Sequence, residues 1–546
     1  MSGGACFCKL TICLQNSYYY ELRKIAFLGI LKVKWDRMVF LGFDYFFGGI
    51  FRRKNDDVLG HFHLLILVIK NNIHGGTQME NKKRKSVSEL RSALSEKSVA
   101  SSFVSGLYDL GTFAELGAYV KRATTPADKG DKASDFEGVI TGYGAVDGRL
   151  VFAYVQDSSR MKGAFGEAQA RKICSLYDMA IKAGAPMIGV YDCCGAKLEE
   201  GVAAMAAYAK VMKKMADASG YIPQIAVING VCAGSMSAIA AMSDFVVASS
   251  EAEMYVTSPF VTKLSASVEI SAKCGTVDVV CSSDKLAAKV KELLVYLPQN
   301  SDSEAIVENS DDLNRMTPEL SGMLGNGKMR DIIKAISDNG NVYEVASDYA
   351  PEMISAFVSV GGYSCGVVAN NPEVKDGAIT PDAADKAAGF VNLCTSFGLP
   401  VITLVDSVGT EGNAENETAA YASSIASLAY SYAQAPAALV TAIVGKAYGV
   451  AGTVFGSKSV GADVVYATEN AVISALAPEA AVSFLYGKEI ADAEKPDEAR
   501  KEKIAEWKED NASPVSAARL GEIDDIVVAD ELRQRICAAV EMMNAD

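Results

Sequence analysis

Histidine is missing from most of this 546-residue chain. The three histidines, His61, His63 and His74, all precede Met79. A body without imidazole excludes Ser-His-Asp and Cys-His triads, histidine-ligated zinc sites and a histidine general base. Any catalysis by the chain after Met79 must therefore use other groups.

Positive charge is also scarce after Met79. Residues 1–78 carry a net charge of +5, whereas the remainder carries −20. Nucleic acid rewards clustered Lys and Arg side chains that face its phosphates. We therefore expect no nucleic acid partner, although a local basic groove for an anionic cofactor is compatible with this charge.

Long apolar runs and paired cysteines are absent as well. The two most apolar stretches, residues 38–51 and 61–69, fall short of the roughly 18–20 residues that a spanning helix needs. No secretory signal pattern is present. The twelve cysteines contain no CxxC pair, so we expect no metal site and reduced, mostly buried thiols in a cytoplasmic protein.

Residues 1–78 differ from the rest in composition, with aromatic clusters and no clear periodicity. Gly75-Gly76 stands shortly before Met79, and such a pair can be encoded by a ribosome-binding sequence. We expect translation to start at Met79 and residues 1–78 to be a non-native or disordered leader. Intact-mass measurement of the native protein tests this.

The chain from about residue 136 contains an internal duplication. In the first copy, residues 166–183 have the period of an amphipathic helix, residues 187–191 that of a buried strand, and residues 199–218 that of a long helix. A strand at 225–228 follows. The sequence then predicts a turn at 229–235, a short helix and a strand at 245–248.

The second copy repeats this order. It predicts a helix at 383–397, strands at 401–405, 439–444 and 464–467, a helix near 418–434, and a turn at 445–450. Asp192 thus matches Asp406, and Gly230 matches Gly445. Strands and helices that alternate with short loops indicate an α/β fold with parallel strands in each copy.

A segment of different character separates the copies. Residues 286–297 predict a helix that ends at Pro298, and the polar stretch 299–314 follows. We place the domain boundary near 299–330, which gives domains at residues 79–310 and 311–546.

Ligands of parallel sheets collect at the carboxyl ends of strands, where loops and helix N-termini present unpaired N–H groups. Each copy has two glycine turns there, at 194–197 and 233–235 and at 409–412 and 448–452. Backbone N–H groups can stabilise an oxyanion without any titratable side chain. The alternative is that these glycines only permit tight turns, and the pattern alone leaves an α/β enzyme of unknown substrate.

Specific motifs add a family resemblance. The chain is similar to the biotin-dependent acyl-CoA carboxyltransferase family, of the propionyl-CoA carboxylase β-subunit and methylmalonyl-CoA decarboxylase α-subunit type, over essentially residues 101–542. The motifs that carry it are Phe136–Gly144, Gly166-Glu167-Ala168, Gly184-Ala185-Pro186, Gly195–Gly201, Ile222–Ile225, Cys232-Ala233-Gly234, Gly366–Pro372, Ala384–Ala388, Leu404-Val405-Asp406 and Lys446–Gly449.

The resemblance implies two tandem crotonase-like domains, each a ββα spiral. It implies transfer of a carboxyl group between biotin, held on a separate biotin carboxyl carrier protein, and the α-carbon of a short acyl-CoA. The further partners are a biotin carboxylase or membrane decarboxylase subunits. The family's active site lies between the first domain of one protomer and the second domain of its partner, so a homodimer or larger homo-oligomer is implied.

The family pattern also assigns residues. Gly234 and Ser235 are expected to stabilise the acyl-CoA enolate, and the turn Gly449-Val450-Ala451 is expected to serve biotin. Other candidates are expected to contact the substrates. These are Gly195 and Ala196 on the CoA side, Lys197 as a ligand of a CoA phosphate or else only a solvated charge, Gly409, and Thr453 at the acyl-selectivity position.

This sequence departs from the family pattern in several places. Cys194 and Lys197 replace the outer residues of Gly-Gly-Ala-Arg, Ser235 and Val450 replace glycines, and Ser423-Ser424 stands for Arg-His. A β-branched Val450 does not comfortably take a positive φ and narrows its pocket. These changes indicate a divergent subfamily or a partner subunit with impaired catalysis.

Two other functions stay open. A crotonase-type acyl-CoA hydratase or hydrolase would use the same oxyanion geometry with an added acidic base, but no paired-Glu site is evident. A scaffold subunit would have lost its catalytic turns. No biotin-attachment motif of the Ala-Met-Lys-Met type occurs, which favours a separate carrier.

Overall fold

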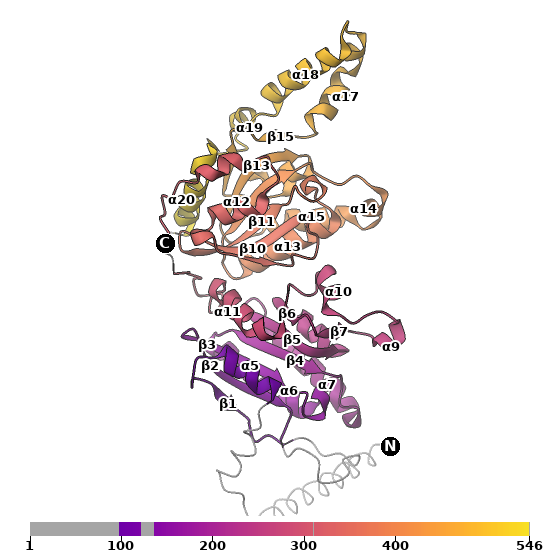
Figure 1. Ribbon diagram of the computed structural model, residues 1–546, viewed down its shortest axis with the longest axis vertical. Coiled ribbons are helices and arrows are strands. Elements are labelled where there is room, and N and C mark those ends of the chain that lie inside the picture. The colour runs from indigo at the N-terminus through magenta and orange to yellow at the C-terminus, as the bar shows by residue number, and fades with distance from the viewer. Residues whose placement is uncertain (1–97, 122–135, 309–310, 545–546) are drawn as a thin grey trace, which may run out of the picture. The chain divides into compact units, whose positions relative to one another are not determined.

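The computed structural model describes residues 98–121, 136–308 and 311–544 (Figure 1). The leader expected at residues 1–78 lies outside the described residues. Within the described ranges, no helix is both long enough and apolar enough to cross a bilayer.

The first sheet is mixed. Its strand order is β1-β2-β3-β4-β5-β6-β8, and the short strand β7 pairs with the end of β5. Strands β1 to β3 are antiparallel neighbours, and the rest of the sheet is parallel. The strands are β1 Ala114–Leu116, β2 Val139–Val146, β3 Arg149–Gln156, β4 Met187–Cys193, β5 Gln224–Ala233, β6 Phe245–Ser249, β7 Glu253–Tyr255 and β8 Val279–Cys281.

The second sheet repeats this topology. Its order is β9-β10-β11-β12-β13-β14-β16, with β15 on the end of β13. Strands β9 to β11 are antiparallel neighbours, and the others are parallel. The strands are β9 Val342–Val345, β10 Met353–Val360, β11 Tyr363–Asn370, β12 Val401–Ser407, β13 Leu439–Tyr448, β14 Val464–Thr468, β15 Val472–Ser474 and β16 Asp525–Val527. The predicted duplication is therefore confirmed.

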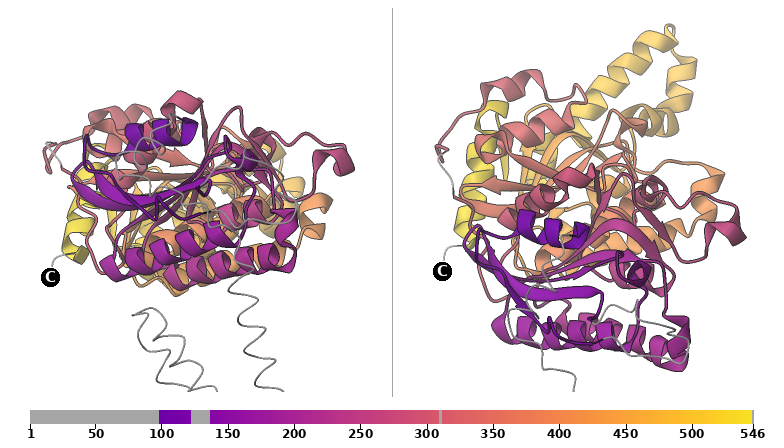
Figure 2. Two further views of the ribbon diagram at one scale, coloured as in Figure 1. Left: turned by 90° about the horizontal axis from the view of Figure 1, so that it is seen from below. Right: turned by 60° about the horizontal axis from the view of Figure 1, so that its bottom comes forward.

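Helices cover the sheets in matching positions. Helix α6 buries Ile173, Leu176 and Ala180 and ends where Gly184 takes a left-handed conformation. It packs beside α7 (Figure 2), as α13 packs beside α15 in the second half. The bounds are α5 Val99–Leu107, α6 Glu167–Ala183, α7 Val202–Ala218, α8 Ser235–Ala241, α11 Leu286–Tyr296, α12 Met329–Ile336, α13 Pro381–Ser396, α15 Tyr421–Ala433, α16 Val450–Val454 and α20 Leu532–Asn544.

Further helices lie on the surface. The hairpin of α17 (Pro478–Asp492) and α18 (Pro496–Asn511) projects from the second half in Figure 1. The short helices α9 (Pro259–Thr262) and α10 (Val268–Lys273) lie between β7 and β8. Helix α14 (Ala414–Thr418) follows β12, and α19 (Pro514–Leu520) precedes β16. Within α18 no residue is buried, so this helix contributes no side chain to the core.

The turns predicted at 229–235 and 445–450 were largely wrong. Strand β5 continues to Ala233 and β13 continues to Tyr448, because each strand leaves one neighbour and pairs with a short strand beyond its bend. The glycines at these bends mark a change of direction within the strand. The helix expected at 418–434 is divided where Ala420 takes a φ of 57°.

The segment between the halves is tied to both of them. Asn300 Nδ2 donates to the carbonyl of Gly184 at 2.8 Å, and the N–H of Val307 donates to the carbonyl of Gly362 at 2.8 Å. The predicted helix at 286–297 is confirmed as α11. The predicted boundary near 299–330 stays a prediction.

Candidate active site

An aspartate holds the bend of the central strand in the first half. Oδ1 of Asp192, at the end of β4, accepts a hydrogen bond from the N–H of Val231 at 3.2 Å. A Cβ atom on Gly230 would lie 2.3 Å from that oxygen. Only glycine leaves room for the carboxylate, and the bond fixes the bend after which β5 pairs with β7.

The second half repeats this contact. Oδ1 of Asp406 accepts from the N–H of Lys446 at 2.9 Å, and a Cβ on Gly445 would lie 2.4 Å from the same oxygen. Burial raises the pKa of Asp406. The predicted matches of Asp192 with Asp406 and of Gly230 with Gly445 are confirmed.

Each bent strand ends in a glycine of unusual conformation. Gly234 has φ 63° and ψ −132°, and Gly449 has φ 52° and ψ −118°. The N–H of Gly234 donates to the carbonyl of Tyr255 at 2.8 Å, and that of Gly449 donates to the carbonyl of Ser474 at 2.9 Å. This region of φ and ψ is essentially restricted to glycine, so the sequence, the bend and the short strand together impose one geometry on both turns.

Helices α8 and α16 start directly after these glycines. Their first peptide N–H groups belong to Ser235 and Met236 and to Val450 and Ala451. Helix geometry offers these donors no intrahelical acceptor. Each half therefore presents adjacent N–H groups at the carboxyl end of its central strand, where a developing negative charge is stabilised.

Val450 does not create the expected conflict. Among the described residues with positive φ, Val450 does not occur, because Gly449 takes that conformation one position earlier. The β-branched side chain is partly buried against the core. The expectation that Val450 strains the turn was wrong, whereas its effect on pocket width stays a prediction.

A second loop follows β4 in the first half and carries Gly195 and Ala196. The N–H of Phe165 donates to the carbonyl of Gly195 at 2.9 Å, and the N–H of Lys197 donates to the carbonyl of Phe165 at 2.8 Å. Gly195 has φ 123°. Because β4 and β5 are parallel neighbours, this loop and the turn at Gly234 lie at adjacent strand ends.

Gly409 occupies the corresponding loop of the second half. Its carbonyl accepts from the N–H of Ile379 at 2.8 Å, as that of Gly195 does from Phe165. A Cβ on Gly409 would lie 2.8 Å from the carbonyl oxygen of Tyr448. Since Tyr448 precedes Gly449, the structure brings Gly409 against the turn that carries Val450 and Ala451.

Lys197 is neither solvated nor free. Its side chain is only 4% exposed, and its ammonium lies 3.2 Å from the carboxylate of Glu200. That carboxylate also accepts the N–H of Glu167 at 2.7 Å. Lys197 therefore belongs to an ion pair that fixes the loop to the start of α6, and its role toward a CoA phosphate stays a prediction.

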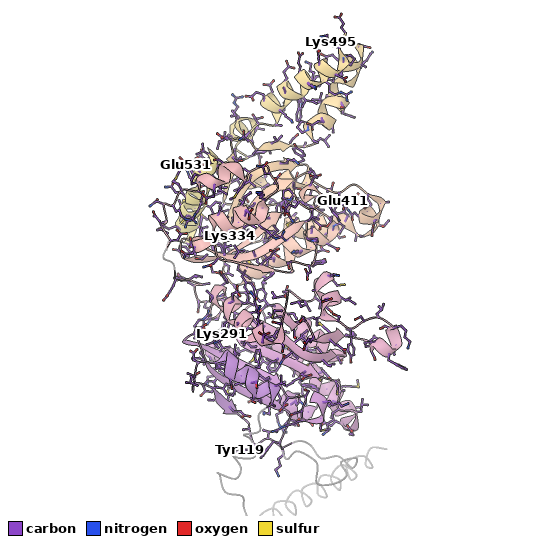
Figure 3. The ribbon with its side chains drawn as sticks, in the orientation of Figure 1. Tyr119, Lys291, Lys334, Glu411, Lys495 and Glu531 are labelled. Carbon is purple, nitrogen blue, oxygen red and sulfur yellow. The ribbon has the colours of Figure 1, made fainter. Side chains whose placement is uncertain are left out.

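The last candidate, Thr453, lies on α16, and the departures from the family pattern at Ser423 and Ser424 lie on α15. Thr453 is exposed, and its hydroxyl donates to the carbonyl of Gly449 at 2.8 Å. Ser424 is buried in α15, while Ser423 is exposed. Glu411, marked in Figure 3, follows Gly409 and pairs with Lys375 at 3.1 Å.

Sequence reasoning missed a group of thiols beside the first loop. Cys193 pairs in register with Cys232, and Cys194 is exposed. Burial raises the pKa of the Cys193 thiol to about 11, so this thiol stays protonated at neutral pH. Adjacent cysteines at a strand end were the only signal in the sequence.

Within each half, the candidate residues lie close together. The candidates of the first half do not contact those of the second half through any hydrogen bond or ion pair found for the described residues. Gly195 and Ala196 lie beside the turn at Gly234, and Gly409 lies beside the turn at Gly449. Among the interactions found for the described residues, no hydrogen bond or ion pair joins Ser235 to Val450 or Ala451. Two separate backbone sites result.

The comparison with known families agrees with this arrangement. Residues 95–546 match the model of the carboxyl transferase domain. The chain belongs to the carboxyl transferase family. It is an enzyme of that family, as the motifs implied.

Curated relatives of this chain include proteins named as enzyme subunits. The chain is 36% identical to the methylmalonyl-CoA decarboxylase subunit alpha of Propionigenium modestum, over 80% of this chain and 88% of that protein. It is 34% identical to the methylmalonyl-CoA carboxyltransferase 12S subunit of Propionibacterium freudenreichii subsp. shermanii, over 82% and 88%.

A solved carboxyl transferase confirms the expected fold. The transcarboxylase 12S hexamer with methylmalonyl-coenzyme A bound matches with a TM-score of 0.79 and 33% identity, over 86% of this chain and 96% of that one. Its fold is crotonase-like, and the two mixed sheets described above correspond to it. The prediction of two tandem crotonase-like domains is confirmed.

Proposed function

We propose that this protein transfers a carboxyl group between biotin on a separate carrier protein and the α-carbon of a short acyl-CoA such as propionyl-CoA or methylmalonyl-CoA. The observation that carries the proposal is the pair of equivalent backbone turns after Gly234 and Gly449. Carboxyl transfer develops negative charge on two oxygens, one on the thioester enolate and one on the biotin ureido group. A two-site protein suits two such oxygens.

The first turn suits the thioester. The N–H groups of Ser235 and Met236 lie just after the end of β5, beside the loop of Gly195 and Ala196, and a thioester oxygen needs only such donors. Removing a single oxyanion donor typically costs about 10²- to 10³-fold in rate. The substitution of a family glycine by Ser235 preserves the N–H.

The second turn suits the biotin ureido group. The ureido oxygen is an uncharged acceptor in the ground state, and the N–H groups of Val450 and Ala451 are donors without an intrahelical partner. When bound, biotin supplies the carboxyl group and accepts the α-proton. The chain's own part is to hold the ureido oxygen and to orient the ring between Gly409 and Thr453.

These two backbone sites explain how the chain after Met79 could catalyse the transfer without a histidine. Backbone amides stabilise both charges at any pH, and they need no reorganisation during the reaction. The acid–base step belongs to the ureido group. Aspartates 192 and 406 act through the backbone, because each one fixes the bend that leads to a turn.

We further propose that the active site forms between protomers of a homodimer or larger assembly. Large apolar side chains are exposed on the first half, among them Leu198 at 84% and Phe260 at 82%, and on the second half at Phe484, at 85%. Such exposure is typical of interfaces. The match to a structure described as a hexamer supports an assembly of this kind. In the proposed arrangement, which the family resemblance implies, the Gly234 turn of one protomer faces the Gly449 turn of its partner.

The proposed partners are a biotin carboxyl carrier protein together with a biotin carboxylase or membrane decarboxylase subunits, and the proposed location is the cytoplasm. The similarity to a decarboxylase subunit supports the second kind of partner. Pull-down of a biotinylated carrier by the purified chain tests this part.

A decarboxylation assay tests the proposal itself. The chain is incubated with methylmalonyl-CoA or malonyl-CoA, with and without free biotin or a biotinylated carrier. Loss of CO₂ that depends on biotin is the expected result. Turnover of an enoyl-CoA or thioester without biotin would instead identify a hydratase or hydrolase, and CoA binding without any turnover would identify an impaired partner subunit.

A further inference from the structure

A cavity lies beneath α16 in the second half. Its volume is about 170 Å³. It is bounded by Val405 near the end of β12, by Thr441 and Ile443 in the first half of β13, and by α16. The rest of the lining comes from residues 455–457, from Val465 of β14 and Ile473 of β15, and from Glu522 and Ile523. Ala451 lines this cavity and also belongs to the turn proposed to hold the ureido group. The cavity and that turn therefore share one residue.

Two equivalent positions of the first half carry larger side chains. When the strand pair β4 and β5 is aligned with the pair β12 and β13, Tyr191 of the first half is equivalent to Val405 of the second half. Met236 lies two residues after Gly234, as Ala451 lies two residues after Gly449, so these two residues are also equivalent. Tyr191 and Met236 are fully buried and are larger than Val405 and Ala451, whereas Phe455 is larger than its counterpart Ala240.

The second half also gains a hydroxyl group at this place. In the same alignment of the two sheets, Ala226 of the first half is equivalent to Thr441 of the second half. Thr441 lines the cavity. Thr441 is 1% exposed, and its Oγ1 has no hydrogen-bond partner among the described residues. The neighbouring hydroxyls of Thr403 and Tyr432 satisfy each other at 2.8 Å. A buried hydroxyl without a hydrogen-bond partner destabilises the folded protein, unless a bound molecule in the adjacent space forms a hydrogen bond with it.

The lining defines the chemistry of the occupant. Glu522 is the only charged residue among the described residues that line the cavity, and a carboxylate repels anions. Bicarbonate, phosphate and acyl carboxylates are excluded, because no basic group offsets their desolvation. A cavity of about 150 Å³ is known to hold benzene or xenon, so the site takes a small neutral molecule with one hydrogen-bond acceptor.

We infer that this cavity binds CO₂, held by the hydroxyl of Thr441. The inference rests on the proposed function. In that reaction the N–C bond of carboxylated biotin breaks and leaves its electron pair on the ureido group, which then takes the α-proton of the thioester. The resulting enolate carbon attacks CO₂ and forms the new C–C bond. A cavity that is lined mostly by apolar side chains and shares Ala451 with the turn retains CO₂ between these two steps.

Binding is measured on the intact protein without biotin or acyl-CoA. Crystals are exposed to CO₂ under pressure, and others to xenon. Difference density for CO₂ within hydrogen-bond distance of Thr441 Oγ1 is expected. In solution, ¹³CO₂ titration of T441V is expected to show about fivefold weaker binding, the effect of one hydrogen bond. T441L, which fills the volume, is expected to abolish binding of both gases.

T395V is the matched control, because Thr395 is a buried threonine of α13 whose hydroxyl is satisfied within its own helix. It should bind CO₂ as the parent does. T441V should not lower Tm, since it removes an unpaired group. Ordered water bridged to Thr441 with no CO₂ density, or equal CO₂ affinity in T441V, would overturn the inference. If CO₂ binds but no biotin-dependent transfer occurs, the proposed function fails and the CO₂ site stands.

Discussion

Gly234 and Gly449 adopt the same rare backbone conformation at the ends of equivalent strands, with φ near 60° and ψ near −120°. Both glycines donate their N–H to a short strand, and a helix starts directly after each. The two halves therefore share a backbone conformation at this place, although their side chains differ. We expect the activity of the protein to depend on these two turns.

Replacing either turn glycine by alanine tests this dependence. For G234A we expect kcat/KM to fall about 100-fold, because a Cβ strains this conformation and tilts the donors. No atom lies within 4 Å of the added Cβ, so the fold is retained. G220A is the matched control, since Gly220 has φ 71° and the same open surroundings. Equal activity losses in both variants would contradict the account.

Gly409 supports the second turn by close approach. A Cβ in G409A would lie 2.8 Å from the carbonyl oxygen of Tyr448, and backbone must move to accept it. We expect G409A to weaken the use of free biotin while KM for the acyl-CoA changes less than threefold. Steady-state kinetics with each substrate varied in turn measures the split. A larger rise in KM for the acyl-CoA than for biotin would assign Gly409 to the other site.

The ion pair of Lys197 and Glu200 predicts a stability effect. K197M removes the cation beside the buried carboxylate of Glu200, whose remaining partner among the described residues is the N–H of Glu167. Breaking a buried ion pair in this way typically costs about 3–5 kcal/mol. The double variant K197M/E200Q should recover part of that loss in urea unfolding. If Lys197 instead binds a CoA phosphate, K197M would raise KM for the CoA substrate far more than for its dephospho analogue and leave stability unchanged.

Asp244 gives the stability a pH dependence. Burial raises the pKa of Asp244 to about 7, whereas the pKa of an aspartate in an unfolded chain is about 3.9. Between these values the native state holds a proton that the unfolded chain has lost, so this residue's contribution falls as pH rises from about 4 to 7. D244N keeps an acceptor for the N–H of Gln224. Its Tm relative to the parent should increase from pH 4 to pH 8, and a constant difference would refute the assignment.

The duplicated order of helices and strands could be predicted from periodicity, and the matches of Asp192 with Asp406 and of Gly230 with Gly445 followed from it. The strand bends could not, because they depend on a carboxylate that fits only against glycine and on short strands far along the chain. Gly230 and Gly445 therefore resembled turn residues. The Lys197–Glu200 spacing was visible, but burial of the pair is a property of the folded loop.

The central claim is tested most directly by CO₂ release from methylmalonyl-CoA or malonyl-CoA by the purified full-length protein, with and without biotin. The account predicts release that requires biotin and that G234A and G449A each reduce about 100-fold or more. Release that is the same without biotin, or that survives both substitutions, would contradict it.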